Sequence, residues 1–237
     1  MSLKNKAVLI TGATGGLGRI VTREFLKAGA KVGAVYIIDK EWETYEATMN
    51  GDKSNLTGIR ADVLTDAGVK SMVEAMINAF GRIDVVVNLV GGFSGGVPIT
   101  ETVEADWDKM MNLNLKTVFL SCKNIMPEMI RQKSGRIINI SSRAGLQGAA
   151  NYAAYAASKA ALINLTQTIA DEGRPHNITA NAILPSIIDT PANRKAMPDA
   201  NFKDWATPEA IADAILFLSS GAASEISGAS IPVYNKA

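Results

Sequence analysis

The chain has 237 residues, enough for one α/β domain with a substantial core, and 24 lysines and arginines nearly balance 23 aspartates and glutamates. This balance, without a basic stripe, argues against a nucleic-acid partner. Cys122 is the only cysteine and His176 the only histidine, which excludes an intrachain disulfide and predicts no metal site. No apolar stretch approaches the ~20 residues of a membrane-spanning helix, and no signal-peptide cleavage pattern follows the first apolar run. We therefore expect a soluble, cytoplasmic protein without a membrane partner.

Short β-branched segments alternate along the chain with longer segments of helical period. The first pair is AVLIT, followed by apolar residues at helical spacing that stop at Gly29. A later helical segment, DAGVKSMVEAMINAFG, places Val69, Met72 and Met76 on one face. The further strand-like segments bring the total to about seven and are, in chain order, KVGAVYII, LTGIRADV, IDVVVNLVG, RIINISS, ITANAILP and SGASIPV.

The strand-like segments are continuously apolar, which indicates burial on both faces. This pattern predicts an α/β fold with a Rossmann-type, doubly wound parallel sheet and helices on both faces. No repeat, low-complexity tract or linker interrupts it. We expect a single domain over residues 1–237, with a dinucleotide-binding N-terminal half.

A glycine-rich loop, GATGGLG, connects the first predicted strand to the first predicted helix. Gly12, Gly16 and Gly18 would let the backbone approach a pyrophosphate at the helix N-terminus. A glycine-rich turn without a ligand is the alternative. The spacing Gly-x-x-x-Gly-x-Gly also differs from the commoner Gly-x-Gly-x-x-Gly.

This glycine pattern after Thr11 resembles that of the short-chain dehydrogenase/reductase family. Further segments that match the family in order are ADV, WDKMMNLNL, NISS, YAASK and NAILPSIIDTP. NLVGG stands where the family usually has Asn-Ala-Gly, so the chain departs at Leu89 and Val90 but keeps Asn88 and Gly91. Together the matches span nearly the whole chain.

The resemblance implies an oxidoreductase with NAD or NADP as its cofactor and no metal. It implies that Asp62 contacts the adenine amino group and that Thr190 meets the nicotinamide carboxamide. The cofactor-binding residues that we expect are Gly12, Thr14, Gly15, Gly16, Leu17, Gly18, Tyr36, Asp39, Asp62, Val63, Asn88, Gly91, Tyr155, Lys159, Pro185, Ile188 and Thr190.

Tyr155 and Lys159 are four residues apart in a helical segment, so their side chains share one face. The ammonium of Lys159 is expected to lower the pKa of Tyr155 from its reference value near ~10 and to make it a usable acid/base. By resemblance, Ser142 hydrogen-bonds the substrate oxygen, whereas Ser141 points to the opposite side. Asn114 resembles the family asparagine whose backbone holds a water that links Lys159 to solvent.

The choice between the two nicotinamide cofactors is usually made just after the second strand. Family spacing puts Tyr36 at the position of the acid that binds the ribose 2′-hydroxyl, with Asp39 and Lys40 close behind. Gly15 stands where many NADP-using members carry arginine or lysine. These features favour NAD slightly and leave NADP open.

The expected substrate is a small carbonyl compound or alcohol. Phe93, in the loop GGFSGG, could stack on a flat ring, and a substrate loop is expected around residues 186–206. Within it, DTPANRKAMPDANF, followed by Trp205, resembles the dihydropteridine reductases, which are the alternative; those enzymes generally lack a serine at the position of Ser142. A non-catalytic NAD(P)-sensing protein is a second alternative, against which the complete catalytic set argues.

Two predicted helices, from Trp107 to about Arg131 and from about Tyr155 to Glu172, are apolar over much of their circumference. One side of each can pack on the sheet. The remaining surface, and the interfaces of the resembling family, predict a homodimer or homotetramer.

Overall fold

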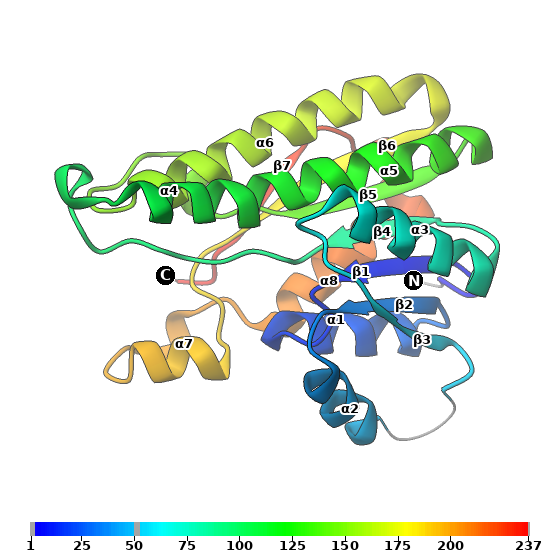
Figure 1. Cartoon of the computed structure of the whole chain (residues 1–237), viewed down its shortest axis with the longest axis horizontal. Coiled ribbons are helices and arrows are strands. Elements are labelled where there is room, and N and C mark those ends of the chain that lie inside the picture. Colours follow the sequence, from blue (N-terminus) through cyan, green and yellow to red (C-terminus); the bar gives the residue numbers. More distant parts are fainter. Residues whose placement is uncertain (1–2, 50–52, 237) are drawn as a thin grey trace.

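A computed structural model describes residues 3–49 and 53–236, and seven parallel strands lie at its centre within those ranges (Figure 1). Their order across the sheet is β3-β2-β1-β4-β5-β6-β7. The chain therefore starts in the middle of the sheet and builds outward in both directions. The strands are β1 (Ala7–Thr11), β2 (Lys31–Tyr36), β3 (Leu56–Arg60), β4 (Val85–Asn88), β5 (Gly135–Ile140), β6 (Ile178–Pro185) and β7 (Ser230–Val233).

Helices cover both faces of this sheet, as the continuous apolar strands predicted (Figure 1). In β1, Val8 and Ile10 belong to the core on one face, and Ala7 and Leu9 to the core on the other. The first face is covered by α1 (Gly16–Lys27), α2 (Asp39–Thr48) and α8 (Pro208–Ser219), and the second by α3 (Asp66–Phe80), α5 (Thr117–Gln132) and α6 (Ala153–Gly173). The doubly wound α/β prediction is confirmed.

The helical segment predicted from Trp107 to about Arg131 contains a wide turn. It consists of α4 (Glu104–Met111), a π-helix over Asn112–Lys116, and then α5. The N–H of Thr117 donates to the carbonyl of Asn112, five residues earlier. Such π turns insert a residue into a helix and often lie at functional sites.

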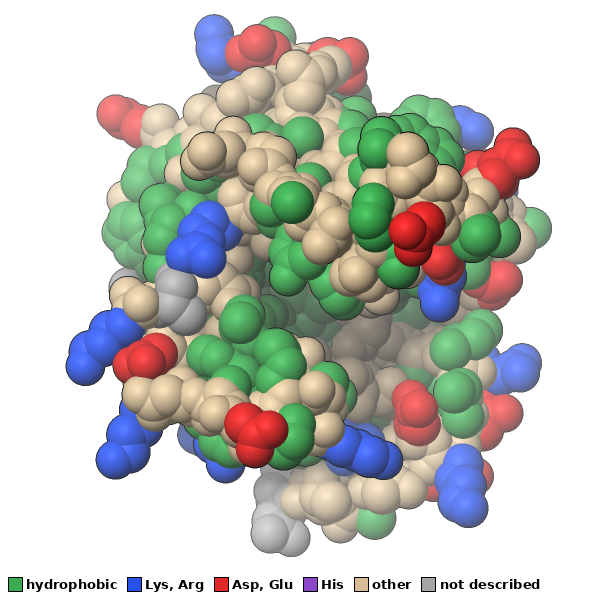
Figure 2. Space-filling view, turned by 90° about the vertical axis from the view of Figure 1, so that its left-hand side faces the viewer, with side chains coloured by type: hydrophobic (Ala, Val, Ile, Leu, Met, Phe, Trp, Pro, Cys, Tyr) green, Lys and Arg blue, Asp and Glu red, His purple; other side chains and the backbone are tan. Residues whose placement is uncertain are grey.

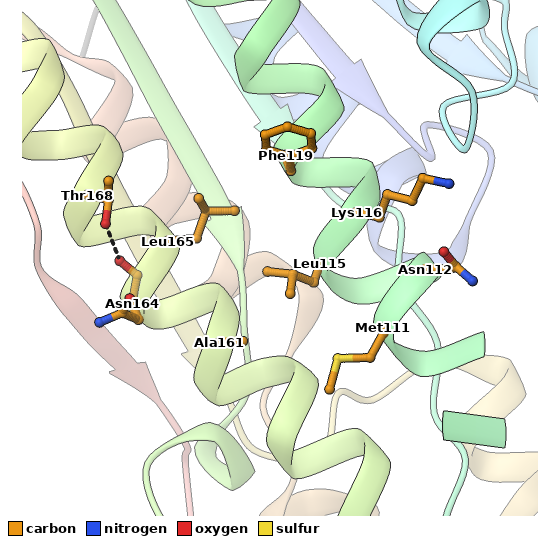
Figure 3. A pocket seen from close by; sticks show the side chains of 9 residues that line it. All are labelled: Met111, Asn112, Leu115, Lys116, Phe119, Ala161, Asn164, Leu165 and Thr168. Atoms are coloured by element: carbon orange, nitrogen blue, oxygen red, sulfur yellow. Dashed lines mark hydrogen bonds between the residues drawn. The ribbon is translucent and has the colours of Figure 1, made fainter. Parts of the chain in front are cut away.

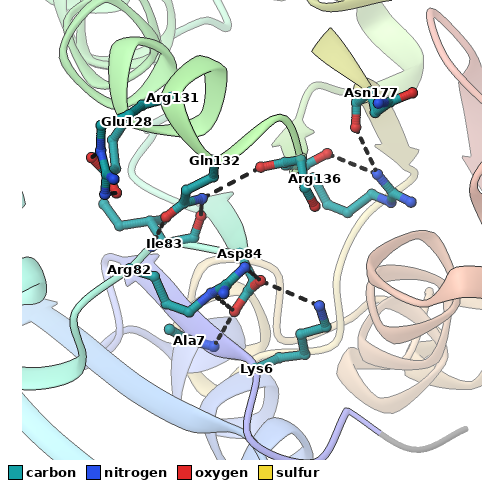
Figure 4. Close-up of polar contacts among 12 residues, drawn as sticks. Lys6, Ala7, Arg82, Ile83, Asp84, Glu128, Arg131, Gln132, Arg136 and Asn177 are labelled. Atoms are coloured by element: carbon teal, nitrogen blue, oxygen red, sulfur yellow. Dashed lines mark hydrogen bonds and ion pairs between the residues drawn. The ribbon is translucent and has the colours of Figure 1, made fainter.

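A buried carboxylate fixes the edge of the sheet at which the strands begin (Figure 4). Asp84 precedes β4 and accepts hydrogen bonds from the backbone N–H of Ala7 at 2.9 Å, from Arg82 at 2.8 and 3.0 Å, and from Lys6 at 3.2 Å. Beside it, the amide of Gln132 exchanges hydrogen bonds with the backbone of Ile83. These contacts tie β1, β4 and the end of α5 together.

The described ranges contain no helix with both the length and the apolar character that crossing a membrane requires.

Candidate functional site

The carboxyl ends of the strands meet at the opposite edge, where the molecular surface is hollowed between its upper and lower parts (Figure 2). The glycine loop lies at this edge between β1 and α1. Gly12 has φ +68°, and a Cβ on Gly18 would lie 2.1 Å from the Gly12 carbonyl oxygen. Helix α1 begins with no side-chain cap and no acid in its first turn. Its first N–H groups and its positive dipole end therefore suit a pyrophosphate.

A cavity of about 190 Å³ opens beside the glycine loop, and we call it the nucleotide pocket. Its wall is mostly apolar, with a few polar groups at the rim, as is typical of sites for flat ligands. Five of the residues expected to bind the cofactor line it, and the full lining is Gly12, Thr14, Val35, Tyr36, Ile37, Ala61, Asp62, Val63, Leu64, Val90 and Leu113.

At one end of the pocket, the ring of Tyr36 stacks on Trp42 with centroids 5.1 Å apart. Asp39 begins α2, and its carboxylate pairs with the guanidinium of Arg60 at 3.2 Å. The carboxylate of Glu41 contacts the glycine loop, where it accepts a hydrogen bond from the Thr14 hydroxyl at 3.0 Å. Sequence reasoning missed Glu41, because only the folded chain brings α2 against this loop.

Buried amide side chains hold the loop that follows β4. Asn88 donates to Asn139 at 2.8 Å, and Asn139 donates to Thr166 at 2.9 Å, which links β4, β5 and α6. Thr11 accepts from the backbone N–H of Leu89 at 3.1 Å. Asn139 was not predicted, because asparagine within an apolar strand gives no sign of a partner on a distant helix.

Asn114, in the π-helix, is fully buried and clamps the next part of this loop. Its side chain accepts from the N–H of Gly92 at 2.8 Å and donates to the Gly92 carbonyl at 3.1 Å and to Ser158 at 3.0 Å. A Cβ on Gly91 would lie 2.9 Å from Asn114 Oδ1 and 3.4 Å from Lys159 Nζ. The absence of a side chain at Gly91 therefore leaves room for both Asn114 and Lys159.

Tyr155 and Lys159 occupy successive turns of α6, with Lys159 Nζ 5.9 Å from the centroid of the Tyr155 ring. The ammonium donates to the Ile140 carbonyl at 2.9 Å, and burial lowers the pKa of Lys159 to about 8. The pKa of Tyr155 is raised, chiefly by burial, while a hydrogen bond with Ser142 lowers it. The net lowering of this pKa that was expected beside Lys159 is therefore not observed, because burial dominates.

The two serines after β5 both contact α6, but they have different partners there. Ser142 accepts from the N–H of Ala144 at 3.2 Å and hydrogen-bonds Tyr155. Ser141 is buried and donates to the backbone carbonyl of Lys159 at 2.8 Å. The fold thus brings Ser142, Tyr155 and Lys159 together, with Asn114 behind them.

Three aromatic rings, those of Phe93, Tyr152 and Tyr155, pack against one another, and we call them the aromatic wall. Phe93, 57% exposed, contacts Tyr155 and Tyr152 edge to face, with centroids 5.0 and 5.3 Å apart. A backbone hydrogen bond of 2.8 Å from Gly96 to Asn151 joins the two loops that carry these rings. The aromatic wall places apolar surface next to the phenol of Tyr155.

The segment around residues 186–206 follows β6, which ends at Pro185. Ser186 donates to the Tyr234 carbonyl at 2.6 Å. Thr190 caps α7 (Pro191–Ala196) by accepting from the N–H of Asn193, and Asn193 in turn donates to the Ile188 carbonyl at 2.8 Å. A Cβ on Gly16 would lie 3.2 Å from Thr190 Cγ2, which places Thr190 against the glycine loop.

The residues of the DTPANRKAMPDANF string largely contact one another. Arg194 binds both carboxylate oxygens of Asp189, at 2.6 and 2.7 Å, and lies over the ring of Phe202. Phe202 in turn contacts Trp205, with centroids 4.9 Å apart. These contacts stabilise the conformation of the loop that contains them.

In the part of the chain that the structure describes, neither a metal-binding cluster nor the cysteine thiol forms a second candidate site. No group of three or more His, Cys, Asp or Glu residues there could hold a metal ion. Cys122 is buried, and burial raises the pKa of its thiol to about 12. It therefore packs as a small apolar residue.

Comparison with known proteins identifies the family and agrees with the fold described above. Residues 6–201 match the family described as short chain dehydrogenase. The chain is 35% identical over 236 residues to 3-oxoacyl-[acyl-carrier-protein] reductase of Thermotoga maritima, with 96% of each chain covered. It is 32% identical to NAD-dependent glycerol dehydrogenase of Listeria innocua, over 96% of this chain and 91% of that one. The solved structure of ElxO with NADP bound superposes with a TM-score of 0.92 at 29% identity and 97% coverage of both chains.

The chain belongs to the short chain dehydrogenase family. It is an oxidoreductase, and its cofactor is NAD or NADP, as predicted. The glycine loop and the nucleotide pocket described above fit such a cofactor.

The buried ammonium of Lys159 gives a test by stability. Its pKa is about 8 in the folded protein against an ordinary value of 10.5, so between these values the unfolded chain binds more protons. The free energy of unfolding should therefore rise with pH in this window. From pH 8 to pH 10 the wild type should gain roughly 2 kcal/mol relative to Lys159→Met, at ~1.4 kcal/mol per pH unit. Urea unfolding of both proteins measures this gain, and parallel pH profiles would contradict it.

Proposed function

We propose that the protein transfers a hydride between NAD(P) and a small carbonyl compound or alcohol, with Tyr155 as the general acid/base. The observation that carries the proposal is the convergence of Ser142, Tyr155 and Lys159 at the end of β5, beside the hollow. The nicotinamide, when bound, donates or accepts the hydride. The Thermotoga and Listeria relatives are named for a 3-oxoacyl reductase and a glycerol dehydrogenase, which supports this substrate class.

In the direction of reduction, Tyr155 donates its proton to the carbonyl oxygen as the carbonyl carbon gains the hydride. Because burial raises the pKa of Tyr155, the phenol keeps its proton at neutral pH and is ready to act as an acid. Ser142 hydrogen-bonds the same oxygen and orients it. Lys159 stabilises the phenolate that forms, and a water held by the backbone of Asn114 returns the proton.

The cofactor is proposed to lie across the carboxyl ends of the strands within a single domain. The glycine loop holds the pyrophosphate, Asp62 and Val63 face the adenine, and Tyr36 packs beside its ribose. On the nicotinamide side the proposed contacts are Asn88, Gly91, Tyr155, Lys159, Pro185, Ile188 and Thr190. The loop around residues 186–206 then covers the substrate.

A dihydropteridine reductase is the second candidate function. Two observations favour it: the exposed ring of Phe93 offers an aromatic surface beside Tyr155, and the DTPANRKAMPDANF string resembles that branch. The hydrogen bond between Ser142 and Tyr155 favours carbonyl and alcohol chemistry instead.

A substrate screen separates the two candidates. Purified protein is assayed by nicotinamide absorbance against ketones and aldehydes, secondary alcohols and quinonoid dihydropterin, each with both cofactors. We expect turnover of carbonyl compounds or alcohols. Turnover of the dihydropterin alone would select the second candidate, and no turnover with any class would contradict both.

Replacing Tyr155 with phenylalanine removes one hydroxyl and little volume. We expect Tyr155→Phe to lower kcat by about 100- to 10,000-fold, the usual contribution of a positioned acid, with cofactor affinity unchanged. Tyr152→Phe is the matched control. The substitution keeps the ring in the aromatic wall and removes only a hydroxyl. Because Ala156, and not a lysine, stands four residues after Tyr152, this variant should retain most turnover. Near-normal kcat in Tyr155→Phe would overturn the assignment.

We also propose that the chain forms a homodimer or homotetramer through the predicted helices. A groove of about 440 Å³ runs between the π-helix with α5 and the facing side of α6 (Figure 3). Phe119, at its wall, is 47% exposed. The groove is lined by Met111, Asn112, Leu115, Lys116, Phe119, Ala161, Asn164, Leu165 and Thr168.

Introducing a charge into this groove should weaken the association. We expect Phe119→Asp to shift the protein toward the monomer in sedimentation velocity at micromolar concentration, because burying an unpaired carboxylate is unfavourable. Ile99→Asp, at an apolar residue that is 74% exposed and does not line the groove, should leave the assembly intact. A monomeric wild type would refute the proposal.

A further inference from the structure

We propose that Glu41, and not Asp39, is the carboxylate that binds the adenosine ribose of the cofactor and favours NAD over NADP. The inference rests on the proposed function, in that the cofactor lies on the glycine loop. Asp39 was among the residues expected to bind the cofactor, close behind Tyr36 at the position of the family acid, and the proposal gives the ribose contact to Glu41 instead.

The position of Glu41 is set by a contact with the glycine loop. Thr14 lines the nucleotide pocket, and its hydroxyl donates to Glu41 Oε2 at 3.0 Å. This bond brings a carboxylate from α2 to the rim of the pocket. Glu41 lies in the first turn of α2, where the helix dipole favours a negative charge.

Glu41 can bind a ribose without giving up this contact. An ionised carboxylate offers about four lone-pair sites on its two oxygens, and the bond from Thr14 uses one of them. Glu41 is exposed, and no salt bridge to it lies within the described residues. Its remaining sites can therefore accept the hydroxyls of a ribose that lies against Thr14.

Asp39 differs from Glu41 in its partner. Its carboxylate pairs with Arg60 at 3.2 Å, at the end of β3, so its charge is largely offset there. It has no hydrogen bond with the glycine loop among the described contacts. An unpaired acid beside the loop repels a 2′-phosphate more strongly than a paired acid does.

Among the described residues, no basic side chain forms an ion pair with Glu41. Arg19 donates to the Thr14 carbonyl at 2.7 Å, and its guanidinium lies over the ring of Tyr45. Around Tyr36, the acids Asp39, Glu43 and Glu46 outnumber Arg60. A phosphate at the ribose 2′ position would therefore meet a net negative surface, whereas a hydroxyl would find an acceptor.

The test compares Glu41→Gln with Asp39→Asn, two neutral variants of nearly unchanged size. Dissociation constants for NADH and NADPH are measured by nicotinamide fluorescence, which needs no substrate. The wild type should prefer NADH. Glu41→Gln should shift the ratio of the two constants toward NADPH by at least roughly tenfold, as expected for loss of a short-range repulsion. Asp39→Asn should shift it by less than about threefold.

Either of two results overturns the inference alone: a wild type that prefers NADPH, or a shift in Asp39→Asn that equals or exceeds that in Glu41→Gln. A wild type that binds neither NADH nor NADPH would overturn the proposed function and this inference with it. Circular dichroism confirms that both surface variants are folded.

Discussion

The burial of the Lys159 ammonium is the constraint on which the candidate site depends. An ammonium without a partner is costly inside a protein, and here the Ile140 carbonyl at the end of β5 accepts its hydrogen bond. Ser141 holds the backbone of the same lysine, and Gly91 leaves the space that a side chain would fill. The end of β5, Ser141 and the loop after β4 therefore all contact Lys159 or leave room for it. Tyr155 owes its position beside the cation to this fit.

Buried asparagines likewise hold neighbouring elements together by hydrogen bonds. Buried polar groups are stable when they bond one another, and Asn88, Asn139 and Thr166 form such a chain from β4 to α6. Asn114 does the same for the loop at Gly92, and its π-helix provides the wide turn that brings it there. At the opposite edge, Asp84 holds the starts of the strands. The sheet is thus fixed at both edges, which lets loops at the catalytic edge differ without moving the strands.

Much of the fold, and which residues meet at the candidate site, could be predicted from sequence, because the decisive signals are local. Apolar runs define strands, the glycines follow β1 directly, and the four-residue spacing of Tyr155 and Lys159 defines a shared helix face. What could not be predicted depends on contacts between distant segments. The bond from Thr14 to Glu41 joins residues 27 apart, and that from Asn88 to Asn139 joins residues 51 apart. The raised pKa of Tyr155 was missed for the same reason, since burial is a property of the whole fold.

The two sides of the site are stabilised in different ways, and this bears on what each can select. On the nucleotide side, the walls come from strand ends and the first turns of helices, which the sheet fixes. On the substrate side, the loop around residues 186–206 is held by its own contacts, with Arg194 between Asp189 and Phe202. Phe93 lies on a loop with glycines on both sides and is more than half exposed. Under the proposed function, the substrate therefore meets an exposed ring on a glycine-flanked loop, whereas the cofactor meets walls that the strand ends hold in place.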